Sequence, residues 1–329
     1  MYSSSLKDKT ANALLWGGIN NGAQQVLNLV FGIFLARILS PADYGMVGML
    51  TIFSLIATSL QESGFISGLN RKKDITDADY NAVFWFNVLC SSCVYVILFC
   101  CAPLIAAWYR QPVLIPLARL SFLTFVISSL GTSPRAWLFR NMKVRETALL
   151  TLGALTVSGI CGVCLAFNGF AFWGIAIQNL IYCTMMSLGS WWFSGWHPSW
   201  HINLQPLRGM IGFSSKILAT NIFTHINNNI FSIFFGRLYG EKTVGYYNQA
   251  NKWTTMGSNT LVGMLWSVTQ PLFARFDKDD MERMQRVFRK LLRFTAFLSC
   301  PALFGLGLIA PEFITIAITA KWMTSAHLM

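Results

Sequence analysis

The stretch from Trp16 to Leu39, WGGINNGAQQVLNLVFGIFLARIL, is long and apolar enough to cross a bilayer, yet it carries five carboxamide side chains. These are Asn20, Asn21, Gln24, Gln25 and Asn28. Their spacings of four and three residues place them on one stripe of an α-helix, which turns once every 3.6 residues. Polar groups exposed to hydrocarbon cost free energy. We therefore expect this stripe to face other helices or water.

The composition predicts a polytopic membrane protein. The chain has 329 residues, of which 54% are hydrophobic and 12% are charged, whereas soluble domains carry about 25% charged residues. Apolar runs long enough to span about 30 Å of hydrocarbon recur between short basic loops. We predict nine spans, at residues 12–38, 45–68, 82–108, 113–133, 147–167, 170–194, 209–236, 244–272 and 289–310. The final residues, KWMTSAHLM, resemble the start of a tenth span.

The lysines and arginines predict the orientation. Most of the 25 fall in alternate loops, on the side that also holds Lys7 and Lys9, and such residues accumulate on the cytoplasmic side of membranes. The N-terminus is therefore expected to be cytoplasmic. The basic charge is explained by these loops, so no nucleic-acid partner is predicted.

An internal repeat appears when the sequence is shifted by 200 positions. FGIFLARILSPADYG (31–45) then falls on FSIFFGRLYGEKTVG (231–245), which aligns Arg37 with Arg237 and Gly45 with Gly245. Asn21, Gln25 and Asn28 fall on Asn221, His225 and Asn228. Six spans separate the copies, so both run in the same direction, as in parallel repeats of transporters. We expect an all-α fold with two parallel-repeat lobes around a central cavity, formed by residues 1–200 (six spans) and 201–329 (three spans and the start of a fourth). The second lobe is incomplete, which favours a piece of a longer protein over an asymmetric molecule.

The polar stripes predict a binding cavity between the lobes. Two readings remain open: adhesion between helices, worth about 0.6 kcal/mol per contact, and a watery cavity, which we favour because the rows recur in both halves. Amides and hydroxyls with few charges suit a polyhydroxylated ligand. The predicted cavity residues are Asn21, Gln24, Gln25, Asn28, Asn221, His225, Asn228, Asn248, Asn251 and Asn259.

Three charged residues in or near the spans are candidates for an ion or a diphosphate. Glu62 could exchange a proton or bind Na⁺, and the alternative is an interfacial carboxylate. Arg119 and Lys252 could attract a phosphate, and the alternative is that each reaches the headgroups with its long side chain.

Soluble-enzyme chemistry is not predicted. We find no phosphate-binding loop, dinucleotide fingerprint, HExxH or GxSxG pattern, so neither a catalytic residue nor a cofactor is expected. Cys161 and Cys164 have redox-like spacing but lie in an apolar run. His197 and His201 have ligand-like spacing, yet Pro198 breaks the helix that such a metal site needs. No metal site is predicted.

Several stretches, taken in order, resemble the polysaccharide (O-antigen, capsule and colanic acid type) flippases of the multidrug/oligosaccharidyl-lipid/polysaccharide exporter superfamily. They are LARILSPADYGMVGM, RKKDITDADYNAVFWFN, CAPLIAAWYRQPVLIPLARLSF, PRAWLFRNMKVRE, VGYYNQANKW and QPLFARF. The resemblance implies a multi-pass protein of the bacterial inner membrane. It would flip an undecaprenyl-diphosphate-linked oligosaccharide by alternating access, with H⁺ or Na⁺ as candidate coupling ions. Membrane lipids surround it, and the polymerase and glycosyltransferases of the same pathway are candidate partners.

Three alternatives stay open at this point. A cation-coupled multidrug antiporter of the same superfamily would need a membrane carboxylate, for which Glu62 is the candidate. A membrane polyprenyl-phosphate sugar transferase would need clustered acids, and Asp74, Asp77 and Asp79 are a faint match. A non-transporting scaffold is the third.

Overall fold

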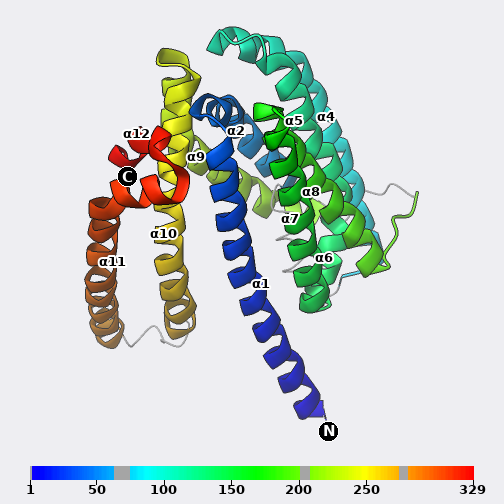
Figure 1. Cartoon of the computed structure of the whole chain (residues 1–329). Coiled ribbons are helices and arrows are strands. Elements are labelled where there is room, and N and C mark those ends of the chain that lie inside the picture. The colour runs from blue at the N-terminus through cyan, green and yellow to red at the C-terminus, as the bar shows by residue number, and fades with distance from the viewer. Residues whose placement is uncertain (1, 63–74, 201–207, 274–280) are drawn as a thin grey trace.

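The computed structural model describes residues 2–62, 75–200, 208–273 and 281–329, with side-chain packing for 15–60, 75–200, 215–257 and 284–329. Every regular element in these ranges is a helix (Figure 1). The first part of the chain forms α1 (Tyr2–Ile38), α2 (Pro41–Glu62), α4 (Asp77–Tyr109), α5 (Leu114–Leu130), α6 (Thr132–Arg140), α7 (Val144–Phe167) and α8 (Ala171–Ser194). The second forms α9 (Arg208–Leu238), α10 (Glu241–Phe273), α11 (Met281–Ile318), a 3₁₀ turn (Ala320–Trp322) and α12 (Met323–His327).

The protein is an all-α, multi-pass membrane protein. Each of the nine predicted spans overlaps a helix, although residues 63–68 of the second lie outside the described residues and the fourth runs across the break between α5 and α6. Within the described ranges, five helices are long and apolar enough to cross a membrane, namely α2, α4, α7, α8 and α11, and α5 with α6 makes a sixth if this pair, bent by 44°, is one span. Over their described residues, α1 and α9 do not reach that threshold, and both helices carry predicted amide rows. The segment KWMTSAHLM forms the 3₁₀ turn and α12.

A capping box starts α2 directly after α1. The backbone N–H and the hydroxyl of Ser40 both donate to a carboxylate oxygen of Asp43, at 2.8 and 2.6 Å. The Asp43 N–H donates back to the Ser40 hydroxyl at 3.3 Å. Pro41 occupies the first helical position, where its missing N–H costs nothing. These contacts satisfy amides that a helix start leaves without partners, and they fix the turn between α1 and α2.

Replacing Ser40 with alanine is expected to lower the free energy of unfolding by about 1 kcal/mol, because the two bonds of the Ser40 hydroxyl, from the Asp43 N–H and to the Asp43 carboxylate, are lost. The thermal midpoint of the purified protein in detergent measures this loss. Ser40→Thr should keep most of the stability, since threonine also caps helices and keeps a hydroxyl that can donate to Asp43. Equal midpoints for Ser40→Ala and the parent protein would contradict the role of the cap.

The two halves of the chain meet where α2 crosses α10. A Cβ atom built on Gly45 would collide with the backbone carbonyl of Glu241, and one built on Gly245 would collide with that of Pro41. The second contact is the counterpart of the first, because positions 45 and 241 correspond to positions 245 and 41 in the 200-residue repeat. Such exchanged contacts are what a two-fold relation between two similar units produces. The repeat seen in the sequence therefore appears in space at this crossing.

The remaining helices of the first half pack around one buried cluster. Phe122, Leu117 and Leu114 of α5 are fully buried in it, together with Met49 and Leu50 of α2. Helix α7 packs on both α1 and α8, and the ring of Phe31 fills the space left by Gly159. This packing fixes the rotation of α1, α2, α5, α7 and α8 about their axes, which decides the side chains that point inward.

Candidate functional site

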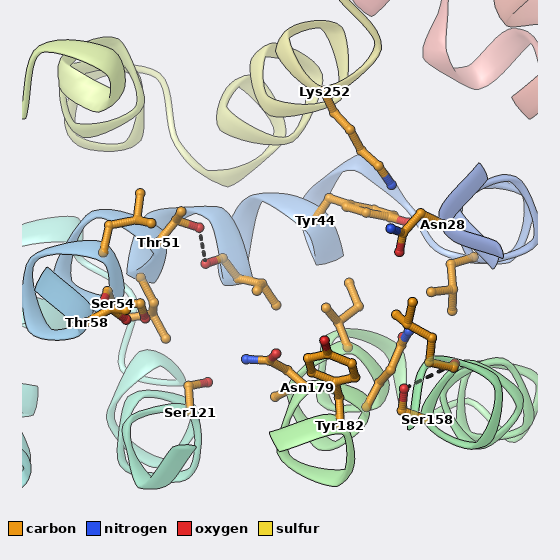
Figure 2. Close-up of a pocket in the computed structure, with 18 of the residues that line it drawn as sticks. Asn28, Tyr44, Thr51, Ser54, Thr58, Ser121, Ser158, Asn179, Tyr182 and Lys252 are labelled. Atoms are coloured by element: carbon orange, nitrogen blue, oxygen red, sulfur yellow. Dashed lines mark hydrogen bonds between the residues drawn. The ribbon is translucent and has the colours of Figure 1, made fainter. Parts of the chain in front are cut away.

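A polar cavity of about 570 Å³ lies among α1, α2, α5, α7, α8 and α10 (Figure 2). Amides, hydroxyls and one amine line it beside apolar groups. The polar lining side chains are Gln24, Asn28, Tyr44, Thr51, Ser54, Thr58, Ser121, Ser158, Gln178, Asn179, Tyr182 and Lys252. A space of this size is typical of small-molecule sites.

Hydroxyl groups of α2 line one end of the cavity. Thr51, Ser54 and Thr58 follow each other at helical spacing, and Figure 2 shows them on one side of the space. Thr51 and Thr58 donate their protons to the backbone carbonyls of Val47 and Ser54, at 3.3 and 2.9 Å. A hydroxyl that donates to its own helix keeps lone pairs that accept. This end therefore offers acceptors, whereas Gln24, Asn28 and Asn179 add N–H donors.

A second cavity of about 430 Å³ adjoins the first and reaches α9 and α10. The two share Tyr44, Val47, Thr51, Ile175 and Lys252. The additional polar side chains of the second are Asn229, Asn248, Gln249, Asn251 and Thr255. The two cavities therefore adjoin at the five shared residues, between the two halves of the chain, and polar side chains stand among apolar ones in both.

Lys252 lies at the junction of these cavities. Its ammonium group is 2.9 Å from the position that a Cβ of Gly32 would take, so the glycine leaves room for it. It also lies 5.8 Å from the ring centroid of Trp253, and Figure 2 shows it reaching toward Tyr44 and Asn28. Among the described residues that line either cavity, Lys252 alone carries charge, and none is an aspartate or glutamate. The site is thus electropositive.

Asn248 is held in place by both halves. The hydroxyl of Ser232 in α9 donates to its side-chain oxygen at 2.8 Å. Its amide nitrogen occupies the space that a Cβ of Gly48 in α2 would fill. Because Gly48 corresponds to position 248 in the repeat, this amide lies beside the crossing of α2 and α10.

The structure places some of the predicted cavity residues in these spaces and others outside. Gln24 and Asn28 line the first cavity, and Asn248, Asn251 and Lys252 line the second, which Lys252 shares with the first. Asn21 and Gln25 are exposed and line neither cavity. On α9, Asn221 and His225 are half-buried and Asn228 is exposed, but it is the neighbouring Asn229 that lines the second cavity.

The other candidates lie elsewhere. Arg119 stacks on Phe99 of α4, with its guanidinium carbon 4.1 Å from the ring centroid, and lines neither cavity. Glu62 is the last residue of α2 and Asn259 lies within α10, but the side chains of both are outside the described residues. Asp79, a candidate acid of the transferase alternative, accepts bonds from Thr76 at the start of α4 and is buried. Asp74 and His201 lie outside the described residues.

Sequence reasoning missed most of the hydroxyl lining. Thr51, Ser54 and Thr58 recur at i, i+3 and i+7, which is a detectable stripe. Ser121, Ser158, Gln178, Asn179 and Tyr182 come from three different helices, and only their packing brings them together. No group of three or more histidine, cysteine, aspartate or glutamate side chains suited to a metal occurs among the residues that the structure describes.

Comparison with known proteins places the chain in a family. The family model described as "Polysaccharide biosynthesis protein" matches residues 34–327. The lipopolysaccharide biosynthesis protein WzxC of Escherichia coli K12 is 25% identical over 324 residues, which cover 97% of this chain and 65% of WzxC. The succinoglycan biosynthesis transport protein ExoT of Rhizobium meliloti is 23% identical over 308 residues, which cover 93% of this chain and 62% of ExoT.

The fold also matches a solved structure. An inward-facing multidrug resistance MATE family transporter of the MOP superfamily superposes with a TM-score of 0.66 at 16% identity, covering 92% of this chain and 75% of that one. The chain spans slightly less than two thirds of the length of the curated relatives WzxC and ExoT. Because the family model covers nearly all of the described helices, from the end of α1 to α12, the chain belongs to the polysaccharide biosynthesis protein family.

Proposed function

We propose that this protein moves an undecaprenyl-diphosphate-linked oligosaccharide from the cytoplasmic to the outer leaflet of the bacterial inner membrane, by alternating access and without catalysing a reaction. Its N-terminus lies in the cytoplasm, and residues 1–200 and 201–329 belong to two lobes that rock against each other. The glycan feeds the synthesis of a surface polysaccharide. The glycosyltransferases and polymerase of that synthesis act before and after it.

The observation that carries this proposal is the chemistry of the joined cavities. They combine amides and hydroxyls, which bond sugar hydroxyls in both directions, with the single cation of Lys252. Among their described lining residues there is no carboxylate that would repel a diphosphate. An ammonium group is a good phosphate ligand as a point charge. The site thus matches a ligand with an anionic end and a polyhydroxylated end.

The order of groups in the cavity suggests how the ligand lies. Lys252, Asn28 and Tyr44 form one region and the hydroxyls of Thr51, Ser54 and Thr58 form another (Figure 2). The diphosphate would bind at Lys252 and the sugars would extend toward the α2 hydroxyls, while the polyprenyl chain stays in lipid. Amide rows Asn21 and Gln25 on α1, and Asn221, His225 and Asn228 on α9, would then line the aqueous path that leads to the cavity. Asn259 would continue this path on α10.

The likeness to a multidrug transporter fold favours a second candidate, a cation-coupled multidrug antiporter. That function needs a carboxylate that binds H⁺ or Na⁺, and Glu62 is its candidate. Glu62→Gln would abolish drug-dependent proton or sodium movement in proteoliposomes if this candidate were correct. Unchanged ion movement, together with loss of glycolipid transport in Lys252→Gln, would reject it.

The test of the main proposal is the location of the lipid-linked oligosaccharide in cells that lack the full-length protein. The glycolipid should accumulate in the cytoplasmic leaflet, where an added impermeant glycosidase in inverted vesicles reaches it. Return of the gene should restore its movement to the outer leaflet. A normal leaflet distribution without the protein would overturn the proposal. Sugar transfer by the purified protein would instead identify the transferase alternative.

A further inference from the structure

The C-terminal ends of α1 and α11 exchange hydrogen bonds, although 280 residues separate them. The guanidinium of Arg37, in the last turn of α1, donates to the backbone carbonyls of Ala317 and Ile316 at 2.8 and 2.6 Å. In return, the ammonium of Lys321 donates to the Arg37 carbonyl at 2.7 Å, and the indole N–H of Trp322 donates to the Ala36 carbonyl at 2.8 Å. Each helix end is therefore capped by the other half of the chain.

These bonds satisfy groups that neither helix can satisfy alone. The last four carbonyls of an α-helix have no partner within the helix, and a cation near them is further stabilised by the helix dipole. Ala36 and Trp322 are fully buried, so water cannot replace the bond between them without separation of the two halves. The other three bonds come from the exposed side chains of Arg37 and Lys321 and surround this buried bond. We call the set of four bonds the α1–α11 latch (Arg37, Ala36, Ala317, Ile316, Lys321 and Trp322).

The latch lies directly behind the polar cavity. The ring of Trp322 packs edge-on against Tyr44, with centroids 5.4 Å apart, and against Tyr246 at 6.1 Å. Tyr44 lines both cavities. Ser325 of α12 donates to the Tyr246 carbonyl at 2.9 Å and ties the segment to α10. Trp322 thus closes the space between α1, α2 and α10 next to Tyr44, at the end of the molecule that holds the α1–α2 and α9–α10 turns (Figure 1).

The backbone before Trp322 is strained. Thr319 has a φ of 91°, a conformation that β-branched residues rarely adopt. This residue directly follows α11 and turns the chain so that Lys321 and Trp322 point back at α1. Strain of this kind persists only where the surrounding contacts hold it, and it is often found in elements that switch. The segment would relax once those contacts are lost.

We call a contact between the ends of two helices from different halves a seam. The seam that corresponds to the latch in the other copy of the repeat joins α9 and α4, and it is built differently. Arg237, the counterpart of Arg37, stacks on Trp108 of α4 at 5.3 Å from the ring centroid. The ring of Tyr109 fills the space at Gly236, and the side chain of Gln111 donates to Glu241 at 2.9 Å. This seam relies on ring packing, which tolerates small rotations, whereas the α1–α11 latch relies on four directed bonds. Of the two seams, the latch is the one that a separation of the halves would disrupt abruptly.

We propose that the α1–α11 latch is the outer gate of the transporter and holds the cavity closed toward the outer leaflet. The direction of opening in this proposal rests on the proposed function. Release of Arg37 and Trp322 from the opposing carbonyls lets the halves separate around Tyr44. Reformation of the four bonds resets the inward-open state.

Hydrogen–deuterium exchange of the full chain in lipid nanodiscs tests the latch. Trp322→Phe keeps the aromatic ring and removes the donor, and Arg37→Gln removes the charge and most donors. Each should raise amide exchange at residues 35–39 and 315–322 by about tenfold, because a broken seam leaves both ends exposed to water. Exchange in α4, α5 and α8 should not change. Lys321→Arg should behave like the parent protein, since it keeps a donor and the charge.

Lys216→Gln is the matched control, because Lys216 is an exposed cation in α9 outside the latch. If amide exchange rose at only one of the two helix ends, or throughout the molecule, the latch proposal would be overturned. To read the direction of opening, Val47, which lines both cavities, is replaced by cysteine in a background without native cysteines. An impermeant maleimide added from the outer side should label it about tenfold faster in Trp322→Phe.

This design separates the latch from the proposed function. Unchanged labelling with normal glycolipid transport would overturn the latch and leave the function in place. Faster labelling of Trp322→Phe, when the parent protein moves no glycolipid, would retain the gate and reject the substrate.

Discussion

Gly45→Ala is expected to destabilise the protein far more than the same change at Gly153, although both glycines lie within helices. At Gly45 the new methyl group would occupy the position of the Glu241 carbonyl, which belongs to the backbone and cannot rotate away. Helix α2 or α10 would have to shift, and overpacking of this kind costs about 1–3 kcal/mol and occasionally more. At Gly153 no other group lies within 4 Å of the new methyl, and alanine is the better helix former by about 1 kcal/mol.

The two-fold relation between the halves predicts a second effect, which a local clash at Gly45 alone would not predict. Gly245→Ala should be as damaging as Gly45→Ala, because its methyl group would meet the Pro41 carbonyl in the equivalent way. Thermal midpoints of the three variants in the same detergent measure these differences. If Gly45→Ala and Gly245→Ala melted like Gly153→Ala, α2 and α10 would not cross at this point, and the relation between the halves would be wrong.

Lys252→Gln should weaken binding of a polyprenyl-diphosphate ligand by about ten- to a hundredfold. A hydrogen bond to a charged group contributes about 1.5–3 kcal/mol, and each 1.4 kcal/mol is a factor of ten in affinity. Glutamine is one bond shorter but still donates, so most of the loss reports the charge. Lys252→Arg should retain most of the affinity. Binding of farnesyl diphosphate to the protein in nanodiscs, measured against farnesol, provides the readout.

Lys242→Gln is the control for this charge effect, since Lys242 is exposed at the start of α10 and lines neither cavity. It should bind the diphosphate like the parent protein. The preference for farnesyl diphosphate over farnesol should fall in Lys252→Gln and fall as well when the salt concentration is raised. Equal affinities of Lys252→Gln and Lys242→Gln for the diphosphate would remove Lys252 from the site.

Much of the fold could be predicted from the chain because it depends on local pattern. The apolar runs predicted the long helices, whereas the Ser40–Asp43 cap between the first two was recognised only in the structure. The 200-residue repeat predicted that Gly45 and Gly245 are equivalent, but not that they touch. Contact between them depends on how the halves dock, and no periodicity in either half contains that information.

The site was less accessible to sequence reasoning. An amide stripe predicts which side chains share a face of a helix, but each residue turns that face by about 100°, so a small rotation decides which of them point inward. On α9 that rotation brings Asn229 to the cavity in place of Asn228. Arg119 and Lys252 are both cations within apolar runs, yet one stacks on Phe99 at the side of α4 and the other reaches the cavity.

The sequence by itself determined the class of protein, the helices and the repeat, because hydrophobicity, spacing and caps act over a few neighbouring residues. Only the tertiary structure decided which polar groups meet. The hydroxyls of α2, α5 and α7, the ammonium of Lys252 and the exchanged caps of α1 and α11 come from positions far apart in the chain. Their proximity follows from close packing of whole helices, in which glycine contacts and buried rings set both the crossing points and the rotation of each helix.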